Sequence, residues 1–122
     1  MQHAASAYAK VSREAIAPRE LEASLLIKAA AQLQYVADDF DNRLPGLDAA
    51  LSYNRKLWTV LAASAAGPDN PQPKHIRENI ANLALFIFNR TFAIGPNSGP
   101  QSLAILIKIN RDLAAGLRGN AA

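Results

Sequence analysis

Apolar and polar residues along most of this chain recur with the period of an α-helix. Large apolar side chains return at steps of three and four over residues 17–40, 47–65, 73–94 and 102–117. Such spacing places the apolar residues on one face of a helix. Residues 2–16 are rich in alanine and poor in large apolar groups, so we expect a loosely packed N-terminal helix over 1–16.

Proline and glycine mark the boundaries between these segments. Pro18 suits the first helical position, where its missing N–H would be unpaired anyway. The sequences NRLPG, GPDNPQP and GPNSGP separate the later segments, and such clusters form turns and loops. The last residues, 118–122, should form a disordered tail. We therefore predict a single domain over 1–122 with an all-α fold, a compact antiparallel bundle of four to five helices.

The segment 73–94 is apolar on more than one side. A helix of this kind is either central in a bundle or partly exposed for binding, and the sequence leaves both options open. The segment 102–117 also has apolar residues off its main stripe. Because so small a bundle can hardly bury both, we expect an exposed apolar groove or a self-association surface, so a homodimer is one option. The expected groove residues are Leu85, Phe86, Phe88, Phe92, Ile105 and Ile109, with Trp58 as support or as part of the wall.

Two asparagines stand where apolar stripes should continue. Asn54 follows Leu47 and Leu51, and Asn110 follows Leu106 and Ile107. A buried amide needs hydrogen-bond partners, since leaving it unpaired costs about 1–3 kcal/mol. The partner is a helix end, a loop carbonyl or the other asparagine. We interpret the two as structural polar residues that fix helix register; the alternative is that one lines a groove and binds a partner's backbone.

Composition excludes several classes of function. The chain has no cysteine, which rules out a disulfide framework, a thiolate metal site and a cysteine nucleophile. Its start lacks the pattern of a secretory signal, and its longest apolar run, LALFIF, is far too short to cross a bilayer. Histidines 3 and 75 have no metal-site spacing, and neither a phosphate loop nor a nucleophile elbow is present. We expect no enzyme activity, no cofactor, no metal and no membrane association.

The charge is mildly basic, with a net charge of +3. Residues 1–43 carry five basic and six acidic side chains, and residues 44–122 carry eight and four. The basic residues are scattered singly rather than gathered in a stripe. Direct RNA binding is therefore an alternative that we rank second; it would involve Arg55, Lys56, Arg90, Lys108, Arg111 and Arg118.

Several segments together resemble the flagellar protein FlaF of alphaproteobacteria. They are PRELEASLL, NRKLWTVLA, the proline-interrupted loop, IRENIANLALFIFNRT and LIKINRDLAAGL, in this order between about Tyr8 and Leu117. The resemblance implies a cytoplasmic regulator of flagellum building that promotes flagellin synthesis and export. It also implies flagellin as partner, bound through a helical terminal segment as by an export chaperone, and FlbT, a restraining regulator of flagellin translation, as a further partner. An alternative is control of flagellin translation on the mRNA or through FlbT.

Overall fold

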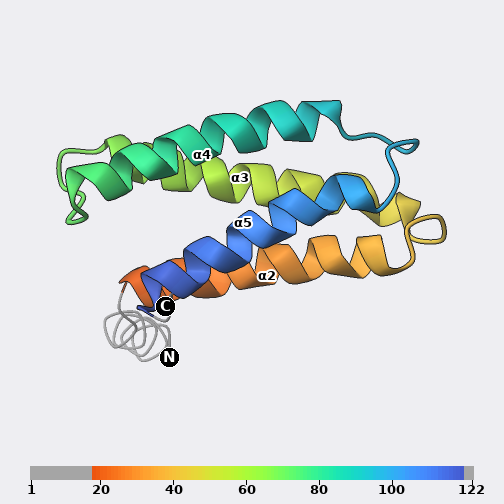
Figure 1. Ribbon diagram of the computed structural model, residues 1–122, viewed down its shortest axis with the longest axis horizontal. Coiled ribbons are helices and arrows are strands. Elements are labelled where there is room, and N and C mark those ends of the chain that lie inside the picture. Colours follow the sequence, from red (N-terminus) through yellow and green to blue (C-terminus); the bar gives the residue numbers. More distant parts are fainter. Residues whose placement is uncertain (1–17, 120–122) are drawn as a thin grey trace, which may run out of the picture.

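A computed structural model describes residues 18–119, and these residues form four helices. They are α2 (Pro18–Asp38), α3 (Leu47–Ala66), α4 (Lys74–Ala93) and α5 (Gln101–Leu117), with a short 3-10 helix, η1 (Leu44–Gly46), before α3. Each helix runs antiparallel to the one before it, and within the described residues there is no strand (Figure 1). The predicted all-α antiparallel bundle is confirmed. The helix expected over 1–16 lies outside the described residues.

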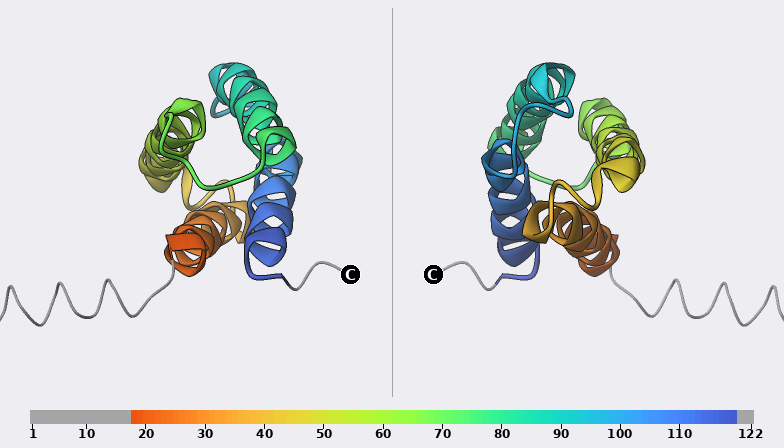
Figure 2. Two further views of the ribbon diagram at one scale, coloured as in Figure 1. Left: turned by 90° about the vertical axis from the view of Figure 1, so that its left-hand side faces the viewer. Right: turned by 90° about the vertical axis from the view of Figure 1, so that its right-hand side faces the viewer.

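The four helices occupy the corners of a bundle. Seen end on, α3 and α5 lie at diagonal corners, as do α2 and α4 (Figure 2). The closely packed pairs are α2 with α5, α3 with α4, and α2 with α3. The backbones of α4 and α5 come close to each other at fewer points than those of the three closely packed pairs. The bundle is therefore tightest around α2 and most open beside α4.

The helix ends follow local chemistry. Pro18 begins α2, where the fixed φ of proline suits a helical start. Asp48 lies in the first turn of α3, where its charge faces the positive end of the helix dipole. Gly99, just before α5, has a φ of 78°, a conformation that residues with a Cβ rarely adopt. Gly67 ends α3 in an extended rather than a left-handed conformation, with φ −72°, because Pro68 follows and requires extended backbone before it.

The core lies between α2, α3 and α5. Eight residues of α3 are buried, from Leu47 to Ala65, but only Ile80, Ala84 and Ile87 in α4. Phe40, which the sequence places at the end of the first long helix, is buried although α2 ends at Asp38. The turn that follows α2 thus contributes to the core. Helix α4 buries one narrow stripe and leaves the rest of its apolar surface outside.

Arg118 fastens the end of α5 to the start of α2. Its Nε donates to both carboxylate oxygens of Glu20, at 3.0 and 2.9 Å, and its Nη2 donates to Ser24 Oγ at 3.2 Å. The hydrogen bond from Arg118 lowers the pKa of Glu20. Arg118 lies in the segment that we expected to form a tail, and its guanidinium contacts the neighbouring helix α2. Residues 120–122 lie outside the described part.

Candidate functional site

The outer surface of α4 exposes large apolar side chains. Phe92 is 82% exposed, Leu85 63% and Phe86 42%. Isolated apolar side chains on a protein surface are ordinary, but Leu85 and Phe92 are exposed along one stripe of α4 and form a patch. A patch of this kind is typical of a surface that binds another polypeptide.

Two of these residues lie on the side of α4 that faces α3. Leu85, Phe88 and Phe92 are spaced by three and four residues, so they share one stripe. Phe92 lines a shallow hollow of about 360 Å³ together with Leu51 and Arg55 of α3. Phe88 is half-buried and packs against the core. Leu85 and Phe92 therefore form an exposed apolar surface beside α3, which we call the α4 edge.

Phe86 belongs to a different side of α4, since it stands about 100° around the helix from Leu85. The guanidinium carbon of Arg90 lies 5.7 Å from the centre of its ring. On α5, Ile105 and Ile109 are half-buried and pack against the core. The residues expected to form one groove are therefore distributed over separate places, and only Leu85, Phe86 and Phe92 are exposed.

Trp58 has no exposed surface. Of the two roles expected from the sequence, support from within agrees with this position, and a place in the wall of an open groove does not. Its indole N–H donates to Asn110 Oδ1 at 2.9 Å. This contact joins α3 to α5 across the diagonal of the bundle (Figure 2).

Asn54 and Asn110 meet in the centre of the bundle, and both are completely buried. Asn110 Nδ2 donates to Asn54 Oδ1 at 2.7 Å. The indole N–H determines how the amide of Asn110 is oriented. Because the indole can only donate, it must face the oxygen of Asn110. Asn54 Nδ2 is buried with no partner. The asparagines thus interrupt the apolar stripes to bond each other and the tryptophan, and neither reaches the surface.

The basic residues considered for RNA lie on three helices, and several are bonded within the chain. Lys108 Nζ lies 2.8 Å from Asp112 Oδ2, and Arg118 binds Glu20. Arg111 donates to Gln34 Oε1 at 3.4 Å. Pairing with acidic residues reduces the positive charge available to a phosphate backbone.

The described residues form no metal-binding cluster. Within residues 18–119, no group of three histidine or acidic side chains could hold a metal ion. None of the four helices is both long enough and apolar enough to span a membrane.

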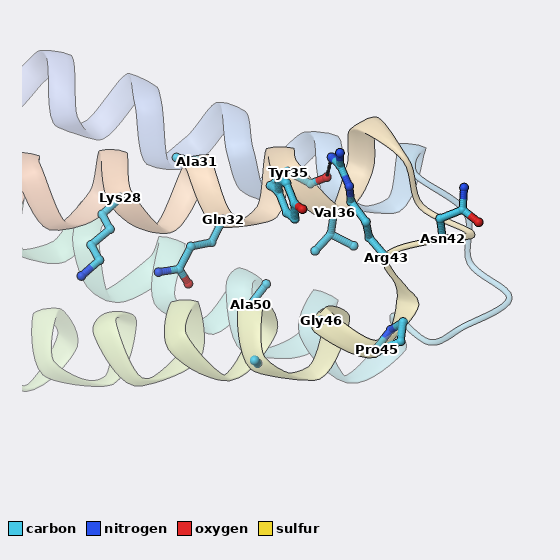
Figure 3. A pocket seen from close by; sticks show the side chains of 11 residues that line it. Lys28, Ala31, Gln32, Tyr35, Val36, Asn42, Arg43, Pro45, Gly46 and Ala50 are labelled. Atoms are coloured by element: carbon cyan, nitrogen blue, oxygen red, sulfur yellow. Dashed lines mark hydrogen bonds between the residues drawn. The ribbon is translucent and has the colours of Figure 1, made fainter.

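A second hollow was not predicted from the sequence. It lies between the later part of α2, the turn over 39–46 and the start of α3, and Tyr35 and Arg43 stand at one end of it (Figure 3). Its signal in the sequence is weak, because it depends on how the turn separates the two helices rather than on any periodicity. The seven-residue spacing of Leu21, Lys28 and Tyr35 along α2 is the one regularity that could have indicated it.

The comparisons with known proteins give one family. A family model described as "Flagellar protein FlaF" matches residues 4–117. No curated protein and no solved structure matches the chain. The match covers all four helices.

Proposed function

Because the chain belongs to the flagellar protein FlaF family, which takes part in flagellum assembly, we propose that it is a cytoplasmic flagellin-binding chaperone that promotes flagellin synthesis and export. The family is one of flagellar proteins rather than enzymes. Flagellin is the partner that the resemblance implies, and its ends are amphipathic helices that must not assemble before export. Holding such a helix requires only an apolar surface of matching shape.

The observation that carries the proposal is the exposed edge of α4. Leu85 and Phe92 are 63% and 82% exposed and lie on one stripe. Burying a Leu or Phe side chain contributes about 1.5–3 kcal/mol, so covering both would contribute about 3–5 kcal/mol before ordering costs. That range corresponds to a change in affinity from about 10²-fold to about 4 × 10³-fold. The hollow beside Phe92 is lined by Leu51 and Ile94 together with polar residues such as Arg55, and it offers a place where a side chain of the partner helix can insert.

The test is a titration of purified flagellin with this protein, followed by calorimetry and size exclusion. We expect a complex at about 10 µM or tighter. Phe92→Asp should weaken it about 10–100-fold, since the substitution removes apolar surface and adds a charge that the interface would desolvate. The absence of a complex with the wild-type protein at tens of micromolar would overturn the proposal.

A matched control separates the surface from a general effect of charge. Ala104→Asp adds the same charge at an exposed position on α5, beside the hollow between α2 and α5. This variant should bind flagellin like the wild type. If Phe92→Asp and Ala104→Asp bind equally well, flagellin does not bind at the α4 edge, and the placement is wrong even though the function stands.

The alternative is control of flagellin translation, on the mRNA or through FlbT. Direct RNA binding predicts a steep loss of affinity with salt, so a gel shift with flagellin mRNA at low and high salt tests it. A pull-down with FlbT, in the absence of flagellin, tests the second form. If FlbT is retained and flagellin is not, the protein is an adaptor rather than a chaperone.

A further inference from the structure

The hollow between α2 and α3, which we call the α2–α3 cleft, has a volume of about 570 Å³. Its floor consists of small or apolar residues: Ala31, Val36, Pro45, Ala49 and Ala50. Gly46 also lines the cleft, and a Cβ at this position would lie 3.9 Å from Val36 Cγ2, in ordinary van der Waals contact. Small side chains on two neighbouring helices let a further polypeptide approach closely.

Two cations stand at the rim of the cleft, and aromatic rings hold both in position. Arg43 lies with its guanidinium carbon 3.7 Å from the centre of the Tyr35 ring, and its Nη1 donates to the Tyr35 carbonyl at 2.6 Å (Figure 3). Lys28 Nζ lies 5.6 Å from the centre of the Tyr53 ring. Cation–π contacts orient these side chains without neutralising them.

Neither cation has an acidic partner within residues 18–119. The ion pairs there are Lys74–Glu78, Lys108–Asp112 and Arg118–Glu20. No aspartate or glutamate lines the cleft. Among the acids at the end of α2 and in the turn that follows, Asp38 accepts from Gln34 and Asp39 accepts from the amide of Asn42, whereas Asp41 makes no side-chain hydrogen bond or ion pair within residues 18–119. The rim therefore presents positive charge around an apolar floor.

Exposed apolar side chains continue along the same two helices beyond the cleft. Lys28 lies opposite Tyr53, and Val36 lies opposite Gly46. This antiparallel register places Leu21 of α2 opposite Val60 of α3, and these side chains are 41% and 65% exposed. Tyr35, at the other end, is 60% exposed. Leu21 and Tyr35 are fourteen residues apart on α2, which is about 21 Å or four helical turns.

The α2–α3 cleft is separate from the α4 edge. Ala49 and Tyr53 lie on the side of α3 that faces α2, whereas Arg55 lines the hollow beside Phe92 on the other side. Helix α3 therefore separates the two surfaces. A partner bound in the α2–α3 cleft leaves the α4 edge free.

We propose that the α2–α3 cleft binds an amphipathic helix of another protein, one that carries acidic residues two turns apart on either side of an apolar pair. Lys28 and Tyr35 are seven residues apart on α2, and the guanidinium of Arg43 lies on the Tyr35 ring. The positive charges of Lys28 and Arg43 are therefore about 10 Å apart along the cleft. Glutamates at positions i and i+7 of a partner helix match this separation. Leucines at i+3 and i+4 would then face the floor of small residues.

Charge argues against the two other occupants. The chain's own residues 1–17 carry Lys10, Arg13 and a single acid, Glu14, so they are not acidic. A second copy of the chain has a net charge of +3. An acidic partner is the complement that this rim selects.

The probe is a synthetic helical peptide of about 15 residues with glutamates and leucines at those positions, and its control has glutamine in place of glutamate. Binding to the full-length protein is measured by fluorescence anisotropy of a labelled peptide. We expect the glutamate peptide to bind at least about fivefold more tightly than the glutamine peptide. Added salt should reduce this difference.

Variants assign the binding to the cleft. Lys28→Glu and Arg43→Glu should each weaken the glutamate peptide about fivefold, and Ala49→Phe, which fills the floor, should weaken both peptides. Lys74→Glu reverses a charge at an exposed position of α4 that is remote from the cleft and should have no effect. Circular dichroism confirms that each variant is folded.

Three results would overturn the proposal. The first is that the glutamate peptide does not bind at tens of micromolar, or binds no better than the glutamine peptide. The second is a dimer in sedimentation experiments that Ala49→Phe dissociates, which would assign the cleft to a second copy. The third is broadening of the Tyr35 signal by a spin label at Ser6→Cys in the free monomer, which would assign the cleft to residues 1–17. None of these results bears on flagellin binding at the α4 edge.

Discussion

Replacing Asn110 by leucine tests the hydrogen bonds that link Trp58, Asn110 and Asn54 at the centre of the bundle. Leucine has the same number of side-chain heavy atoms as asparagine and branches at the same carbon, so the substitution removes the hydrogen bonds while it keeps the outline of the side chain. Asn54 Oδ1 loses its donor and Trp58 Nε1 loses its acceptor, and both groups are in residues with no exposed surface. Each newly unpaired buried group costs about 1–3 kcal/mol. We expect Asn110→Leu to reduce the free energy of unfolding by about 2–5 kcal/mol, a large part of the stability of a small domain.

The same hydrogen bonds predict that a substitution at Asn54 lowers the free energy of unfolding much less. Asn54 Nδ2 has no partner in the wild type, so Asn54→Leu removes one unpaired group while it leaves Asn110 Nδ2 without its acceptor. The number of unpaired groups stays the same, and we expect a loss of about 0–1 kcal/mol. In the double variant only Trp58 Nε1 is left unpaired. The double variant should therefore be more stable than Asn110→Leu alone by about 2–5 kcal/mol, because it removes both unpaired groups of Asn54.

Urea unfolding followed by circular dichroism measures the four free energies of this double-mutant cycle. The reasoning rests on the order of the three variants rather than on any single value. It would be refuted if Asn54→Leu destabilised the protein as much as Asn110→Leu does. It would also be refuted if the double variant were less stable than either single variant, since the two losses would then be additive.

Three other predictions concern α4 and α2. Ile87→Ala should destabilise the protein by about 2–4 kcal/mol in urea unfolding, because Ile87 is completely buried on the inner stripe of α4; a loss below about 1 kcal/mol would mean that α4 is loosely attached. Phe92→Asp should change the unfolding free energy by less than about 0.5 kcal/mol, since the ring is 82% exposed, and a larger loss would show that the ring supports the fold. Burial raises the pKa of Glu22, so its ionisation opposes folding and this contribution grows as pH rises through the raised pKa. Glu22→Gln should therefore gain stability relative to the wild type at about pH 7 but not at about pH 4, and an equal difference at both values would contradict this assignment.

The sequence predicted the helices well because each helix boundary depends on local chemistry. The segment expected over 73–94 is observed as Lys74–Ala93, and that expected over 102–117 as Gln101–Leu117. Proline and glycine clusters on both sides of each helix determine these ends within the chain itself. The all-α class follows from the same local periodicity.

The surface was harder to predict because helical periodicity does not say which face meets which neighbour. The two apolar sides of α4 were visible in the sequence, but only the packing of α4 against α3 determines that Phe88 is half-buried and Phe92 exposed. Trp58 stands between buried Leu57 and exposed Thr59, and the diagonal placement of α3 and α5 encloses it in the core. The α2–α3 cleft depends on the turn after α2, where sequence patterns show only an interruption.

Trp58 is the single tryptophan of the chain, and it is enclosed and hydrogen-bonded at the centre of the bundle. Its emission should therefore be blue-shifted in the native protein and should move to longer wavelength when the indole meets water. Both proposed surfaces lie outside this enclosure, so a partner that docks without opening the bundle should leave the emission maximum where it is. The protein thus carries an intrinsic optical probe that distinguishes association from loss of structure without any added label.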